Sequence, residues 1–276
     1  TRPLKRELRE VALDLHGDIL QPPASTRAYL QRAVRGGRLQ DVTVKVKGDL
    51  ANFPFERPGA RGEFRVTGQW RDGTFLMVPE EPGSPAWPEA SRVDARLKVT
   101  GQRVEFSEVR GRLMGVEVSR TNGSVDWTAP SVPLILDLQA RGAAQDFLRY
   151  VQATPVNDWT SRVLAGAQAT GVASLGLKLE VPLVGPEAAR VKGSVQLNGN
   201  DLRLSPSLPA LQQARGRVDF SEKGFNVVGS TAQLLGGEVS IEGGISPGGS
   251  MRLNLQGIAQ AASVKAAPEL FWLAPV

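Results

Sequence analysis

The seven residues LMGVEVS at positions 113–119 recur as LLGGEVS at positions 234–240, 121 residues later. When the sequence is compared with itself at an offset of 121 residues, apolar positions coincide over about 25 residues, and so does the predicted turn that separates the first two strands of the unit. The repeated unit, near 95–119 and 216–240, consists of a strand, a turn, a strand, a short break and a strand. The Leu-Met-Gly or Leu-Leu-Gly step predicts a bulge or bend, because glycine inside a strand often marks one. Such a repeat favours an elongated, repetitive sheet over a compact barrel.

Alternation of apolar and polar residues extends this pattern to most of the chain. Val42, Val44 and Val46, for example, alternate with threonine and lysine. A period of two predicts strands with one buried face, and about sixteen strand candidates follow one another closely, which predicts a mainly antiparallel meander. Predicted hairpin turns lie at Asp72-Gly73, Asn122-Gly123 and Gly199-Asn200, with a longer hairpin loop at SEKG, 221–224.

Helical spacing occurs in few places. It predicts helices over about 25–35, 143–151 and 158–165. Two or three short helices cannot cover so many strands. The sheet therefore either folds on itself, as a sandwich or closed barrel, or leaves its apolar face partly open.

Composition excludes several classes of protein. The formal net charge is +5 and the basic residues are scattered, so we expect no nucleic-acid partner. The absence of cysteine excludes disulfides, thiol catalysis and iron–sulfur clusters. No apolar run reaches membrane-spanning length and no signal peptide is evident. The chain also stops without a closing signal, so we expect all 276 residues to be a single continuous fragment of a larger protein.

Candidate chemical sites are few. Asp14, His16 and Asp18 would share one face of a strand and could bind a metal, but His16 is the only histidine and solvated polar residues look the same. No Gly-x-Ser-x-Gly is present, and the glycine-rich stretch 236–249 lacks the Gly-Lys-Ser/Thr of a phosphate loop. We expect no catalytic residues, no metal and no cofactor, and therefore no enzyme.

Several local strings, taken in order, carry a resemblance to a known family. They are NFPF at 52–55, WP at 87–88, the helix at 145–151 followed by TPV at 154–156, VPL at 181–183, and the doubled Leu-Leu-Gly step. Their order and spacing over about 29–255 resemble the YhdP family of AsmA-like proteins, which is related more distantly to TamB. The resemblance implies a Gram-negative envelope protein, anchored in the inner membrane and projecting into the periplasm.

This resemblance also implies a fold and a function. The expected fold is mainly β: an elongated, twisted, curled antiparallel sheet that forms an open hydrophobic groove, with two or three short α-helices. The expected function is to bind phospholipid acyl chains and pass phospholipid between the inner and outer membranes, which parts outside this fragment would contact. A groove of this kind removes the cost of exposing methylenes to water, about 0.8 kcal/mol each, while headgroups stay hydrated.

The alternating apolar residues are the predicted groove lining. They are Val42, Val44, Val46, Leu97, Val99, Val104, Phe106, Leu177, Leu179, Val218, Phe220, Phe225 and Val227. Four arginines around the first predicted helix are possible headgroup contacts, or a solvated helix face: Arg27, Arg32, Arg35 and Arg38. Two alternatives remain open: an assembly factor that binds extended outer-membrane protein segments by strand addition, and a structural periplasmic spacer with a closed, dry core.

Overall fold

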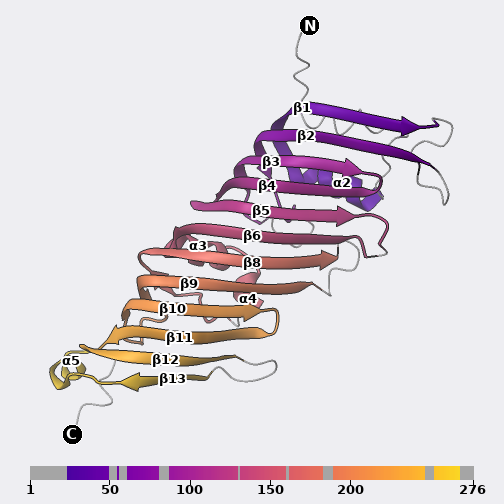
Figure 1. Ribbon diagram of the computed structural model, residues 1–276. Helices are drawn as coiled ribbons and strands as arrows, with labels where there is room; N and C mark the ends of the chain where they lie inside the picture. The colour runs from indigo at the N-terminus through magenta and orange to yellow at the C-terminus, as the bar shows by residue number, and fades with distance from the viewer. Residues whose placement is uncertain are drawn as a thin grey trace. The chain divides into compact units, whose positions relative to one another are not determined.

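The computed structural model describes residues 24–49, 55, 61–80, 87–129, 131–159, 162–182, 189–245 and 252–267. Its strands form a thirteen-stranded sheet in the order β1-β2-β3-β4-β5-β6-β8-β9-β10-β11-β12-β13, with β7 paired to β9 off this path (Figure 1). Strands β1 and β13 are the two ends of the path, so the sheet does not close into a barrel. The predicted class, a mainly β, antiparallel and open sheet, is confirmed.

The chain divides into two compact units. The first, Thr1–Gln139 and Lys178–Ala189, contains β1 (Val34–Gly48), β2 (Gly62–Phe75), β3 (Ala90–Thr100), β4 (Arg103–Leu113) and β5 (Val116–Asp126). The second, Ala140–Leu177 and Arg190–Val276, contains β7 (Gln168–Ala169), β9 (Arg190–Arg203), β10 (Leu211–Ser221), β11 (Gly224–Leu234), β12 (Gly237–Ile245) and β13 (Arg252–Gly257). Strands β6 (Pro133–Ala143) and β8 (Val172–Pro182) each contribute residues to both units.

The described helices are short, and they agree only in part with the predicted ones. Helix α3 (Ala144–Gln152) matches its prediction within one residue, and α2 (Ala24–Ala33) ends two residues early because Val34 already pairs with Phe75 in the β1–β2 ladder. The third predicted helix is wrong in extent: α4 covers Val156–Trp159, and residues 162–166 form turns. Helix α5 (Ala261–Lys265) was not predicted. None of the described helices is long and apolar enough to cross a membrane.

The alternation of the sequence gives the sheet of each unit two unlike faces. In the first unit Val66 of β2 lies opposite Val44 of β1 and Val99 of β3, so apolar side chains share one face. In the second unit Val218 of β10 lies opposite Val195 and Val227 in the same way. We call the faces that carry these valines the apolar faces. The opposite, polar faces carry the intervening charged and amide side chains.

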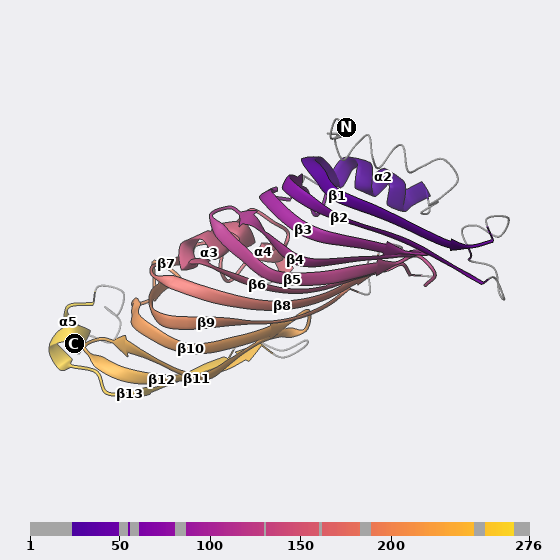
Figure 2. The same cartoon turned by 45° about the horizontal axis from the view of Figure 1, so that its top comes forward.

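An extra residue near the middle of the ladder interrupts every strand from β1 to β5, and β1 has a further shift between Val34 and Gly36. The register shifts place these residues at Asp41, Asp72, Arg92, Glu108 and Arg120, all with φ between 47 and 52°. In the second unit the corresponding residues of β9, β10 and β11 are Gly199, Gln213 and Gly229. A bulge of this kind bends its strand and increases the local twist. A row of bulges therefore curves the sheet of each unit, and Figure 2 shows bent strands in both.

Side chains of neighbouring strands satisfy the backbone at three of these bulges. The N–H of Asp72 donates to Asp94 Oδ1 at 3.1 Å, and the N–H of Glu108 donates to Asn122 Oδ1 at 3.2 Å. The N–H of Gln213 donates to Asp201 Oδ1 at 2.9 Å. These hydrogen bonds are exposed, so each stabilises the bulged geometry only modestly, by about 0.5–1.5 kcal/mol. The polar residues beside the bulges thus have a structural role.

The three predicted Gly-containing hairpin turns are wrong, because all three lie inside strands. Asp72-Gly73 is in β2, Asn122-Gly123 is in β5 and Gly199-Asn200 is in β9. A side chain occupies the space above the first two glycines: a Cβ on Gly73 would lie 2.3 Å from the Trp70 ring, and one on Gly123 would lie 2.4 Å from the Phe106 ring. These glycines make room for aromatic rings, and Gly199 supplies the positive φ of a bulge.

The sequence repeat is also a repeat in the structure. Strands β3 and β4 begin and end 121 positions before β10 and β11 do, and the extra residues of β3 and β10 correspond, as do those of β4 and β11. The hairpin predicted at SEKG is confirmed, but its loop is shorter than predicted, since only Glu222 and Lys223 join β10 to β11. The predicted bulge at the Leu-Met-Gly step is wrong: Met114-Gly115 and Leu235-Gly236 are two-residue turns, with positive φ at both central residues.

Candidate functional site

A row of five valines crosses the apolar face of the first unit. Each lies opposite the next in the ladder, in the order Val44, Val66, Val99, Val104 and Val125. With about 4.8 Å between neighbouring strands, the row is roughly 19 Å long and runs perpendicular to the strands. A continuous aliphatic track of this kind arises because the alternation of all five strands is in phase.

The second unit carries a similar row on its own apolar face. Val195, Val218 and Val227 lie opposite one another on β9, β10 and β11. The row continues through Gly243 of β12 to Leu253 of β13. Beside it, Phe220 lies opposite Phe225 across the β10–β11 hairpin. Each unit therefore has an apolar track that passes from strand to strand.

Exposure distinguishes these tracks from an ordinary core. Val42, Val44 and Val46 of β1 are 46%, 54% and 42% exposed, although all three are aliphatic. The other ten residues of the predicted groove lining are half-buried, and none of the thirteen is fully buried. Val66, at 7%, is the most enclosed member of the first row. Much of this apolar surface is accessible to a ligand.

The main buried cluster of each unit lies around the bulges and beyond them, although Phe64 and Val66 of β2 are also buried. In the first unit Trp70, Val93 and Ala95 form a buried cluster, and the Phe75 ring meets Trp70 edge to face with centroids 6.2 Å apart. In the second unit the buried cluster is Ala214, Ala232, Val239 and Ile241. We call the strand segments on the other side of the bulges the open arms. They run toward the Gly101-Gln102 turn in the first unit and the Glu222-Lys223 turn in the second.

The predicted groove residues fall largely on these open arms. Eleven of the thirteen lie on β1, β3, β4, β10 and β11, and the other two, Leu177 and Leu179, flank the exposed Lys178 on β8. Their role as a groove lining stays a prediction. Sequence reasoning omitted Val66 and Val125, which complete the valine row. The alternation in EFRVTG at 63–68 could have identified Val66.

The polar face of the first unit carries cross-strand ion pairs. Lys45 Nζ lies 2.8 Å from Glu63 Oε2, and Lys98 Nζ lies 2.7 Å from Glu105 Oε2. The hydrogen bond from Lys98 is the main reason that the pKa of Glu105 lies below its usual range, and Lys45 has the same effect on the pKa of Glu63. Exposed pairs of this kind contribute little to stability individually. They mark this face as the solvated one.

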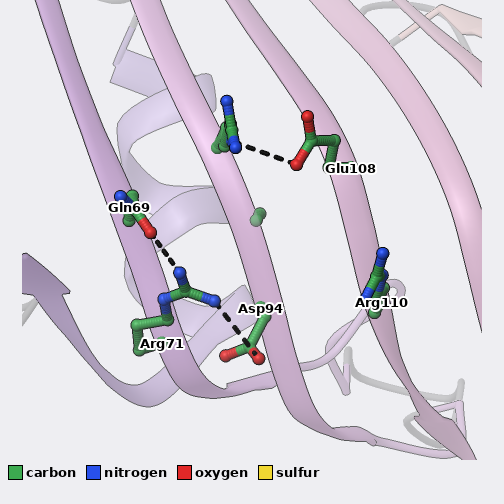
Figure 3. Close-up of a pocket in the computed structure, with 7 residues that line it drawn as sticks. Gln69, Arg71, Asp94, Glu108 and Arg110 are labelled. Atoms are coloured by element: carbon green, nitrogen blue, oxygen red, sulfur yellow. Dashed lines mark hydrogen bonds and ion pairs between the residues drawn. The ribbon is translucent and has the colours of Figure 1, made fainter.

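A cavity of about 220 Å³ on this face shows the same chemistry (Figure 3). Arg71 bonds Gln69 and lies 3.6 Å from Asp94, and Arg96 Nε lies 3.0 Å from Glu108 Oε2. Because acidic partners already neutralise two of its three arginines, we interpret this cavity as part of the ion-pair network and not as a ligand site.

The predicted arginine cluster is divided between two elements. Arg27 and Arg32 lie in α2, whereas Arg35 and Arg38 lie on β1, because the helix ends at Ala33. Arg38 pairs in register with Arg71, which places it on the polar face. The four arginines are therefore not one helix face, and their contact with headgroups stays a prediction.

In the part of the chain that the structure describes, no group of three or more His, Asp or Glu side chains could hold a metal ion. Asp14, His16 and Asp18, the three residues considered above as metal ligands, lie outside the described residues.

Comparison with known proteins gives one match. The model of the family described as YhdP protein matches residues 22–274. No curated protein and no solved structure matches the chain.

Proposed function

Because the chain belongs to the YhdP family, we propose that its apolar faces bind phospholipid acyl chains and form part of a path for phospholipid between the inner and outer membranes. Membership of this family suggests AsmA-like lipid transport and an envelope protein. The periplasmic location, the inner-membrane anchoring of the complete protein and the identity of the cargo as phospholipid belong to the proposal.

The observation that carries the proposal is the accessible aliphatic row of the first unit. Val44 is 54% exposed, yet it continues in register to Val66 and Val99. Burying an exposed valine is favourable by about 1.5–3 kcal/mol, so a row left open favours an apolar ligand. An acyl chain has the required shape, because it can lie along the row from one strand to the next. Its methylene groups would then contact one valine on each strand.

The polar surroundings suit a lipid. The charged headgroup would be costly to bury, whereas an open sheet lets it stay in water while the acyl chains lie on the apolar face. Passage along such a track needs no covalent step. Each position offers similar apolar contacts, so displacement from one to the next exposes little additional methylene surface.

The test is the lipid content of the purified chain, measured by native mass spectrometry and by extraction and identification of bound lipid. The double variant Val44→Asp/Val218→Asp places one carboxylate in each valine row. The control Thr43→Asp/Gln196→Asp adds the same charges on the polar faces, where Thr43 lies opposite Thr67 and Gln196 opposite Arg217. We expect phospholipid on the parent and the control, and at least a fivefold loss from the Val44→Asp/Val218→Asp variant at unchanged circular dichroism.

Other outcomes would overturn the proposal. A parent chain that carries no lipid and refuses added lipid would favour the structural spacer. Extended peptide that binds equally to the parent and to Val44→Asp/Val218→Asp would favour strand addition. If Val218→Asp alone unfolds the chain, Val44→Asp with its control Thr43→Asp still decides the question, since both residues are exposed.

A further inference from the structure

Four cations gather at one edge of the second unit, where the open arms end. Arg190 and Lys192 begin β9, Lys223 lies in the β10–β11 turn and Arg252 begins β13. Because the strands are antiparallel, the start of β9, the β10–β11 turn and the start of β13 lie at the same edge of the sheet. All four side chains are exposed. We call these four residues the cationic edge.

Glu222 is the acidic side chain whose charge interacts with members of the cationic edge, and it balances only part of their charge. Within the described residues, none of the four members of the edge forms an ion pair. The carboxylate of Glu222 bonds the backbone, with Oε2 accepting from the N–H of Val191 at 2.9 Å, and the charges of Lys223 and Lys192 also lower its pKa. That bond is the main reason that the pKa of Glu222 is lowered, so Glu222 is ionised at neutral pH. The four cations and Glu222 together carry a net charge of +3.

The first unit shows what a neutralised set of cations looks like. Lys45 and Arg65 both lie 2.8 Å from Glu63, and Lys98 lies 2.7 Å from Glu105. The contrast matters because the two units repeat the same strand pattern. The second unit has a similar apolar track, but among its described residues these four cations form no ion pair at the end of its open arms.

The cationic edge is close to the apolar row. Lys192 lies opposite Ser221, three residues along the ladder from the facing pair Val195 and Val218. At about 3.4 Å per residue this separation is roughly 10 Å along the strands. Because three is an odd number, the Lys192 side chain starts on the polar face of β9, opposite the face of the valine row. A headgroup that extends past the end of the valine row would meet the cationic edge at the ends of the strands.

We infer that the cationic edge binds the phosphate of anionic phospholipid headgroups, and that the second unit therefore prefers anionic to zwitterionic phospholipid. The inference rests on the proposed function and deepens it by naming the lipid class and the residues that select it. A zwitterionic headgroup brings its own cation and gains less from a net charge of +3. The selectivity should weaken with salt, because exposed charges are screened over about 10 Å at 0.1 M ionic strength.

The experiment is calorimetric titration of the chain with monomeric short-chain phosphatidylglycerol, phosphatidylcholine and inorganic phosphate, at low and at physiological ionic strength. We expect phosphatidylglycerol to bind at least about threefold more tightly than phosphatidylcholine at low salt, where screening is weak. The variant Lys192→Gln/Lys223→Gln should lose that preference and keep its affinity for phosphatidylcholine. The control Lys45→Gln/Lys98→Gln removes two cations that already have acidic partners, and it should keep the preference.

The outcomes separate this inference from the proposed function. Equal binding of both lipids, or a preference that survives in Lys192→Gln/Lys223→Gln, would overturn the cationic edge as the selecting site while leaving lipid binding intact. Binding of neither lipid would contradict the proposed function itself. Inorganic phosphate that binds as tightly as phosphatidylglycerol would make the edge a free-anion site and overturn the assignment to lipid.

Discussion

The ring of Phe220 lies across Gly193, its direct partner on the neighbouring strand β9. A Cβ on Gly193 would lie 2.3 Å from the tip of this ring, closer than two carbon atoms can approach. The glycine therefore fixes where the ring can lie, and the ring covers the backbone that the glycine leaves bare. Phe220 is also one of the predicted groove residues, so this contact shapes the track beside the valine row.

Substitution of Gly193 by alanine should destabilise the protein. The added methyl group must displace the Phe220 ring, and overpacking of this kind costs about 1–3 kcal/mol. Urea unfolding measures the effect. The control is Gly176→Ala on β8, where the nearest atom to a new Cβ is Ser194 Oγ at 3.7 Å, an ordinary contact. The double variant Gly193→Ala/Phe220→Leu should recover part of the loss, and equal destabilisation by both single alanine variants would contradict this account.

Asn200 is a second structural determinant, because its side chain is fully buried at the β9 bulge. Its Nδ2 donates to the carbonyl of Thr170 at 2.8 Å, and its Oδ1 accepts from the N–H of Asn198 at 2.9 Å. Asn200→Ala leaves these groups without partners and should lower the free energy of unfolding by about 2–3 kcal/mol. Thermal and urea unfolding against Asn198→Ala, an exposed neighbour, measure the difference. A loss no larger than that of the control would show that Asn200 is dispensable.

The Lys98–Glu105 pair predicts a measurable titration shift. The pKa of Glu105 is lowered mainly by the hydrogen bond from Lys98, so Lys98→Gln should raise it toward its ordinary value. A folded-state pKa below the unfolded value means that the contribution to stability is present above the unfolded pKa and is lost as pH falls through the folded pKa. NMR titration of the Glu105 carboxyl is the measurement. Arg103→Gln is the control, since Arg103 Nε lies 3.6 Å away and contributes less.

The Met114-Gly115 turn offers a stabilising change. Met114 has a φ of 48°, a left-handed conformation that costs most side chains about 1–2 kcal/mol. Asparagine tolerates this conformation and is favoured in two-residue turns of this type, so Met114→Asn should stabilise the protein by up to about 1 kcal/mol. Met114→Val should destabilise it, because a β-branched residue fits the turn less well. Melting temperatures of the two variants test the sign, and shifts in the same direction would contradict the turn assignment.

The helices show how far local patterns extend. Helix α3 was predicted within one residue, since its apolar face repeats at helical spacing in the sequence. The predicted end of α2 was wrong because Val34 pairs with Phe75, a residue 41 positions away, and no local signal reports that pairing. The same reason accounts for the valine row: Val44, Val66 and Val125 become neighbours of Val99 and Val104 through register alone.

The sequence by itself determined that the chain forms strands with two unlike faces and a repeat at 121 residues, because a period of two and a recurring turn are properties of neighbouring residues. Only the tertiary structure decided what the glycines do and which apolar residues are accessible. The dipeptide Asn122-Gly123 predicts a turn, yet Gly123 lies within β5, where the ring of Phe106 occupies the space that a side chain would fill. Val44 and Val93 are residues of the same type, but Val44 is 54% exposed and Val93 is 5% exposed. Burial depends on what packs against a face, and that is set by bulges and register across strands.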